Sequence, residues 1–146
     1  MKYIEYREKR EHGTREFPYA CYMVTENFPR YNMVPHWHNE CEIIYVRRGT
    51  FELFLNGRTH RIDEGCCSLI IGGSVHGGTP LKDCRYDCLV FDMATLLKAS
   101  QISAIQLQPI LNHEKQFVTV FPADSKPSQY ALAAIEAMLR KPVSYE

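Results

Sequence analysis

Residues 36–49 read His36-Trp-His-Asn-Glu-Cys-Glu42-Ile-Ile-Tyr-Val-Arg-Arg-Gly49. Two histidines lie one residue apart, a glutamate follows the second histidine after three residues, and a glycine follows the glutamate after six. Residues two apart share one face of a β-strand. His36, His38 and Glu42 are therefore expected to point the same way, and His76, which follows a glycine-rich stretch, is a fourth member of the group.

Three imidazoles and one carboxylate that converge on a point are typical of a metal site or a polar ligand pocket. We predict that His36, His38, Glu42 and His76 hold one divalent transition metal such as zinc, nickel or iron. The alternative is that these side chains hydrogen-bond an organic ligand, or one another, without a metal. The same four residues matter in both cases.

Short strands and turns extend from this stretch in both directions. Alternation places Glu42, Ile44 and Val46 on one strand face, and Asn56-Gly57 predicts a type I′ hairpin turn, which needs positive φ at both central positions. Arg47-Arg48-Gly49 is expected to form a turn, and glycine-rich turns are expected on both sides of Val75-His76. The predicted strands cover residues 19–24, 42–46, 50–55, 59–62, 66–71 and 85–93. Such spacing is typical of a sandwich or barrel.

The period changes after Met93. Residues 94–105 are expected to be helical, and residues 117–121 are expected to add an edge strand. Asp124 or Ser125 would cap a further helix with Pro127 in its first turn. The apolar face of that helix, formed by Leu132, Ile135, Met138 and Leu139, would either pack on the barrel or make a dimer contact.

Composition narrows the function classes. The chain has 146 residues, 17 basic and 17 acidic, for a net charge of +0, which argues against a nucleic-acid-binding surface in this segment. It has no apolar run long enough to span a membrane, and its charged first residues are not expected to act as a signal peptide. The six cysteines contain no C-x-x-C pair, so we interpret them as reduced thiols in a cytoplasmic protein.

The spacing from His36 to Gly49 resembles the first cupin motif, in which a His-x-His pair is followed by a glutamate and a glycine. Gly65, Gly73 and His76 match the second cupin motif in register, whereas Ile71 replaces its proline and Pro80 its asparagine. This resemblance implies a mainly β fold, a cupin-type antiparallel β-barrel (jelly roll) followed by C-terminal α-helices. The expected parts are an N-terminal arm (1–16), the barrel (17–93) and a helical part (94–146).

Pro35-His-Trp-His-Asn-Glu-Cys-Glu-Ile-Ile-Tyr-Val46, with Gly49 and the Asn56-Gly57 hairpin, resembles more narrowly the sensor domain of AraC-type transcription regulators. The resemblance implies a homodimer that binds a small-molecule effector and reaches DNA only through a domain missing from this chain. The effector would be a small polar metabolite or a sugar. Its expected contacts are His36, His38, Glu42, Ile44, Val46, Ile71 and His76.

Two other classes remain open at this point. A small metal-dependent cupin enzyme, a dioxygenase or isomerase, would use the same four polar residues. A storage or scaffold cupin would have no small-molecule role and would not be stabilised by a ligand. We favour the sensor over the enzyme, and therefore expect no catalytic residue.

Overall fold

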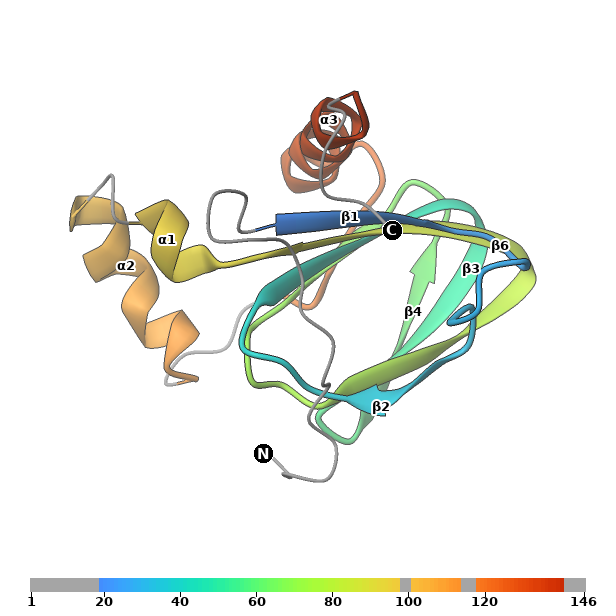
Figure 1. Cartoon of the computed structure of the whole chain (residues 1–146), viewed down its shortest axis with the longest axis horizontal. Coiled ribbons are helices and arrows are strands. Elements are labelled where there is room, and N and C mark those ends of the chain that lie inside the picture. The colour runs from blue at the N-terminus through green and yellow to red at the C-terminus, as the bar shows by residue number, and fades with distance from the viewer. Residues whose placement is uncertain (1–18, 98–100, 114–117, 141–146) are drawn as a thin grey trace.

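Seven strands form one antiparallel sheet that rolls around an apolar interior, and helices follow it (Figure 1). The computed structural model describes residues 19–97, 101–113 and 118–140, so the expected arm at 1–16 lies outside the described residues. The predicted fold class, a mainly β chain with C-terminal helices, is confirmed. The strands are β1 (Tyr19–Val24), β2 (Met33–His36), β3 (Cys41–Leu55), β4 (Arg58–Asp63), β5 (Cys67–Ile70), β6 (His76–Phe91) and β7 (Val120–Phe121).

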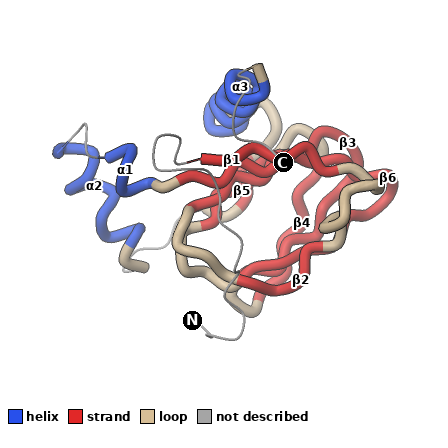
Figure 2. Tube along the Cα trace, in the orientation of Figure 1, coloured by secondary structure: helices blue, strands red, loops and turns tan. Residues whose placement is uncertain are grey.

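The two long strands β3 and β6 form the spine of the barrel. They pair from Cys41 opposite Phe91 to Leu55 opposite His76, and the strand order is β1-β6-β3-β5-β7, with β2 on β6 and β4 on β3. Both strands bend midway, so each contributes to two sides of the barrel (Figure 2). Because of this pairing, residues at the start of β3 and at the start of β6 can reach one interior.

The predicted turn at Arg47-Arg48-Gly49 is wrong, because β3 continues through it. The register against β6 shifts on both sides of Arg48, and Gly49 has a φ of 75°. An irregularity of this kind bends a strand without ending it. A Cβ atom on Gly49 would lie 2.6 Å from the carbonyl oxygen of Lys82, which explains the glycine.

Of the two other predictions about glycines, one is confirmed and one is wrong. Asn56 (φ 48°) and Gly57 (φ 86°) both have positive φ between β3 and β4, which confirms the predicted hairpin. Gly77 and Gly78, expected in a turn, instead lie inside β6. They are needed for close packing, since a Cβ on Gly78 would lie 2.2 Å from the ring of Phe51.

The barrel interior is an apolar cluster, and it confirms the predicted alternation along β3. Ile44 and Val46 are fully buried in it, whereas Ile43 and Tyr45 point outward. Its other fully buried members include Phe51, Leu53, Ile62, Ile70 and Tyr86. Burial of each such side chain contributes about 1.5–3 kcal/mol to folding before entropy is subtracted.

A second cluster lies on the outer face of the sheet, under helix α3 (Lys126–Leu139). Ser125 caps this helix and Pro127 lies in its first turn, as predicted. Ile135 is fully buried, because it packs in one cluster with Cys41, Ile71 and Leu89 on the outer face of the sheet. The apolar face of α3 therefore packs on the barrel, which is one of its two expected uses, and its use in a dimer contact stays a prediction.

The remaining helices, α1 (Met93–Leu97) and α2 (Gln101–Leu111), lie at one end of the barrel (Figure 1). The expected edge strand at 117–121 is the short β7, which pairs with β5. All six cysteines are free thiols, and five of them are buried. No helix in the described part of the chain is long and apolar enough to cross a membrane.

Candidate metal centre

The four polar residues predicted from the sequence meet at one end of the barrel. His36 ends β2, His38 lies in the connection to β3, Glu42 is the second residue of β3, and His76 is the first of β6. One ligand atom from each lies within 4.8 Å of all the others. His36 and His76 are direct cross-strand partners, with ring centroids 4.3 Å apart.

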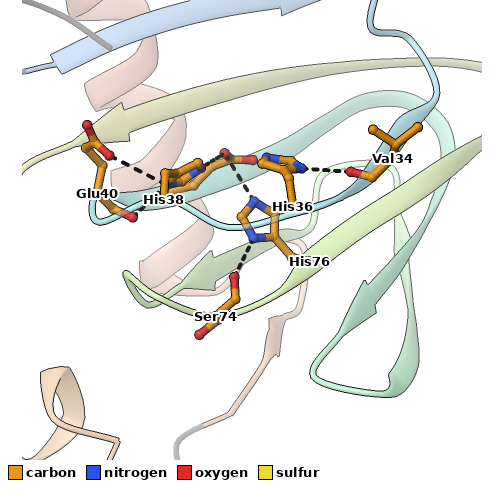
Figure 3. A network of polar contacts seen from close by, with 7 residues as sticks. Val34, His36, His38, Glu40, Ser74 and His76 are labelled. Carbon is orange, nitrogen blue, oxygen red and sulfur yellow. Dashed lines mark hydrogen bonds and ion pairs between the residues drawn. The ribbon is translucent and has the colours of Figure 1, made fainter. Parts of the chain in front are cut away.

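Each imidazole is oriented by a backbone carbonyl near it in the sequence (Figure 3). His36 Nδ1 donates to the carbonyl of Val34 at 2.8 Å. His38 and His76 donate in the same way to Glu40 and Ser74, each at 2.9 Å. Because a carbonyl only accepts, Nδ1 carries the proton in each ring and Nε2 holds the lone pair of the neutral form. Metal-binding histidines are usually fixed by this kind of hydrogen bond.

The Nε2 atoms of two histidines face the carboxylate of Glu42. His38 Nε2 lies 3.2 Å and His76 Nε2 3.6 Å from Glu42 Oε1. Burial raises the pKa of Glu42, but the imidazoles of His38 and His76 beside its carboxylate outweigh burial and hold the pKa well below its ordinary value. Neutral rings in the orientation just described would present lone pairs to a carboxylate, so the group needs a proton or a cation between its members.

Two atoms of the cluster make this need explicit. Among the described residues, Glu42 Oε2 and His76 Nε2 are buried without a hydrogen-bond partner. An unsatisfied buried polar atom costs about 1–3 kcal/mol, so native proteins rarely keep one without a reason. A divalent cation would satisfy both atoms, and three imidazoles with one carboxylate suit zinc, nickel or iron. The donor set therefore fits the metal that the cupin resemblance implies.

A glycine-rich loop holds the histidine segment in place. Gly73 N donates to the carbonyl of His38 at 2.7 Å, and a Cβ on Gly72 would lie 2.0 Å from the carbonyl oxygen of Asn39. His113, just after α2, donates from Nε2 to the carbonyl of Gly72 at 2.9 Å. Sequence reasoning missed this role of His113, because contacts between segments 41 residues apart leave no local pattern.

The predicted apolar wall of the site needs one correction. Ile44 and Val46 lie in the barrel interior, but Ile71 lies in the outer cluster beneath α3. Ile70 takes its place, because it is the direct partner of Glu42 across β3 and β5. Directly paired residues share a sheet face, so Ile70 points inward with Glu42 and Ile71 points outward.

The other histidines stay apart from the cluster. His60 lies half-buried in β4, and His113 lies near the end of α2. His12 lies outside the described residues.

The family model of the AraC-like ligand binding domain matches residues 18–145. The chain belongs to this family. The predicted resemblance to AraC-type sensor domains is thereby confirmed.

This AraC-like domain is similar in sequence to a bacterial regulator. An uncharacterised helix-turn-helix transcriptional regulator of Bacillus subtilis, YdeC, is 33% identical over 86 residues, which cover 57% of this chain and 30% of YdeC. The chain thus matches less than a third of that regulator's length.

Among solved structures, ToxT of Vibrio cholerae has a TM-score of 0.55 at 10% identity over 88% of this chain and 49% of ToxT. A ToxT structure from Vibrio cholerae O395, bound to (E)-4-(8-methylnaphthalen-1-yl)but-3-enoic acid, gives 0.54 at 9% identity, over 86% of this chain and 49% of that one. At these identities the likeness shows the fold alone.

Proposed function

We propose that this AraC-like domain senses a small polar effector for a DNA-binding transcription regulator, and that the effector binds at a metal held by His36, His38, Glu42 and His76. The observation that carries the proposal is the convergence of these four side chains, with two unsatisfied buried atoms, inside a barrel of this family. Membership supports effector binding, and the name of the relative YdeC supports the regulatory role.

A metal held by His36, His38, Glu42 and His76 would supply Lewis acidity toward a small ligand. The chain's own residues orient it: the backbone carbonyls of Val34, Glu40 and Ser74 fix the three imidazole rings. Three of the four ligands are buried, whereas His36 is half-buried and lies at the rim. An effector would therefore approach from the side of His36.

A route from the site to α3 runs through the thickness of the sheet. Glu42 points into the barrel, while its neighbours Cys41 and Ile43 point outward into the cluster that contains Ile135 of α3. In the same way, Ile70 points into the barrel and Ile71 points outward into this cluster. A ligand that moves Glu42 or the 70–73 loop would therefore change the surface on which α3 packs. Such a switch requires the ligand to bind one arrangement more tightly than the other.

The partners of the regulator belong to the same proposal. We expect a homodimer in the cytoplasm, with DNA bound through a further domain. Since the apolar face of α3 is used within the chain, the dimer contact would use another surface, such as the opposite face with exposed Tyr130. Sedimentation analysis of the chain tests this part directly.

The runner-up is a small metal-dependent cupin enzyme, and one observation favours it: three imidazoles with one carboxylate could activate a substrate as well as hold an effector. The two functions differ in the fate of the ligand. A sensor releases the bound molecule unchanged after prolonged incubation in air. An enzyme converts it, and mass spectrometry of the released ligand separates the two.

Calorimetric titration of the metal-free chain with zinc tests the proposed site. We expect about one zinc per chain, and an affinity at least tenfold weaker in His76→Ala, which removes a ligand. His60→Ala is the matched control, because His60 lies outside the cluster. Equal zinc affinity in the two variants would overturn the proposal.

A further inference from the structure

The barrel interior has few polar groups with which to recognise a ligand. Of the buried serines and threonines, Thr50 donates to Asp63 and Ser68 to the carbonyl of Thr119, Ser74 lies beside His76, and Ser128 lies on α3 outside the barrel. Two of the three tyrosines of this cluster donate to carbonyls, Tyr86 to that of Tyr31 and Tyr31 to that of Cys84, and the third is the buried Tyr22. The metal-binding cluster is therefore the main polar point that the described interior offers.

Apart from the thiol of Cys88, which lies against Glu42, the strand partners of the cluster are aliphatic. Ile70 and Val90 are the direct partners of Glu42 on the two adjoining strands, and both belong to the interior cluster. Leu55 is the direct partner of His76 and is only partly buried. A ligand that coordinates at the centre would therefore lie with the rest of its atoms against hydrocarbon.

This surrounding disfavours a sugar. Each hydroxyl of a sugar that loses water without a new partner costs about 1–3 kcal/mol. A pentose or hexose carries several hydroxyls, whereas the metal-binding cluster is the main polar group that the described interior offers them. An apolar body gains free energy on entering the same surroundings.

The net charge of the metal with its four protein ligands further narrows the class of effector. A metal-bound carboxylate is deprotonated, so a divalent metal with Glu42 and three neutral imidazoles carries a net charge of +1. Among the described residues no lysine or arginine is buried, and the buried Asp87 pairs with Arg47 on the outer face. An uncompensated charge in an apolar interior is costly, and a bound monoanion would neutralise it.

We infer that the effector is a small monoanion, a carboxylate on an apolar body, and not a neutral sugar. This inference rests on the proposed function, because it requires the metal. It narrows the effector to molecules with one anionic end and few other polar groups.

Thermal denaturation of the zinc-loaded chain tests the inference with matched ligands. The probes are straight-chain monocarboxylates from acetate to decanoate, the primary amides of the same lengths, and the sugars D-glucose and L-arabinose. We expect at least one carboxylate to raise Tm by several degrees, with at least tenfold weaker binding of its amide. In the cobalt-loaded chain the same carboxylate should alter the visible absorption spectrum, which reports coordination.

A variant pair isolates the charge. Leu55→Asp adds a carboxylate beside His76 and would cancel the net charge, whereas Leu55→Asn changes the size of the side chain equally without charge. We expect the carboxylate to bind Leu55→Asp at least tenfold more weakly than Leu55→Asn, with zinc still bound in both. The partial burial of Leu55 favours folding of both variants.

The outcomes separate the two proposals. Zinc binding with equal effects of amide and carboxylate, or stabilisation by sugars alone, would overturn the inference and leave the proposed metal site intact. Equal binding of the carboxylate to the two Leu55 variants would also overturn it. Absence of zinc binding would overturn both, because the positive charge would then be missing.

Discussion

His38 Nε2 lies 3.2 Å from Glu42 Oε1, and both side chains are only 4% exposed. The two residues are four apart in the sequence, and the connection that enters β3 turns the imidazole toward the carboxylate. Since His38 Nδ1 already donates to the carbonyl of Glu40, Nε2 faces Glu42 either with a second proton or with a lone pair directed at a shared cation. The relationship joins the local backbone to the chemistry of the whole site.

The metal-free protein should show a pH-dependent contribution from Glu42. Because the pKa of Glu42 is held below its ordinary value of 4.5, its stabilising contribution is present above about pH 4.5 and is lost as the pH falls through the folded pKa. Urea unfolding of wild type and Glu42→Gln between pH 3 and 6 measures it. The difference in unfolding free energy should shrink toward the acid end. A difference that stays constant over this range would show that Glu42 has an ordinary pKa.

Gly72→Ala should damage the site more than the fold. The added Cβ would lie 2.0 Å from the carbonyl oxygen of Asn39, so the segment that carries His38 must shift. We expect zinc affinity to fall at least tenfold, because coordination depends on ring position.

Gly57→Ala is the control for Gly72→Ala. Position 57 has a φ of 86° and nothing within 4 Å of an added Cβ, so backbone strain costs about 1 kcal/mol without touching the site. Zinc titration of both variants checks the contrast. An unchanged zinc affinity in Gly72→Ala would show that the loop does not position His38.

Ile135→Ala should loosen α3. Ile135 is fully buried against the sheet, so its truncation should lower the unfolding free energy by about 2–4 kcal/mol. The proposed route from the site to α3 adds a second expectation: zinc should slow hydrogen exchange in α3 of the wild type, and less so in this variant. Tyr130→Ala, on the exposed face of α3, should leave both quantities near the wild-type values. Hydrogen exchange in α3 that is unchanged by zinc would contradict the proposed route from the site to α3.

Arg47→Met should destabilise the outer face of the barrel. Arg47 pairs with buried Asp87 at 2.5 Å and reaches Glu136 of α3 at 3.5 Å. Loss of Arg47 leaves a buried carboxylate unpaired, and we expect a loss of about 2 kcal/mol at pH 7, below the value for fully buried pairs because Arg47 is one-third exposed.

The pH dependence of this variant follows from Asp87. Burial raises the pKa of Asp87 even with Arg47 present, so the loss in Arg47→Met should diminish as the pH falls and the carboxylate is protonated. Arg48→Met, whose partner Asp83 is exposed, should change stability by less than about 0.5 kcal/mol. Urea unfolding at pH 7 and pH 5 measures both variants.

The sequence predicted those features that depend on local alternation and turn chemistry. The two-residue period of a strand grouped His36, His38 and Glu42 correctly, although the three lie at the end of β2, in the connection and in β3 and do not share one strand. The Asn56-Gly57 turn follows from its φ requirement. Ser125 as a helix cap is equally local. The addition of His76 to the cluster depended on the glycine-rich stretch before it and on the cupin resemblance, because its position is set by long-range pairing.

The errors arose where a local pattern has two structural solutions. A glycine after two arginines suits a turn and a bulge equally, and only the pairing of β3 with β6 selects the bulge at Gly49. Residues 66–71 are apolar on both faces, so no alternation shows which face of this strand is inner. The sequence therefore predicts Ile71 in the barrel interior as readily as outside it. The register of Ile70 with Glu42 decides it, and register is not visible in a single strand.

The most direct test of the account is elemental analysis of the chain purified without a nickel column or chelator. If the proposed metal site exists, we expect about one zinc, nickel or iron atom per chain in wild type and in His60→Ala, and its loss in His38→Ala. A well-folded wild-type protein that contains no transition metal, and takes up none on addition of zinc, would contradict it.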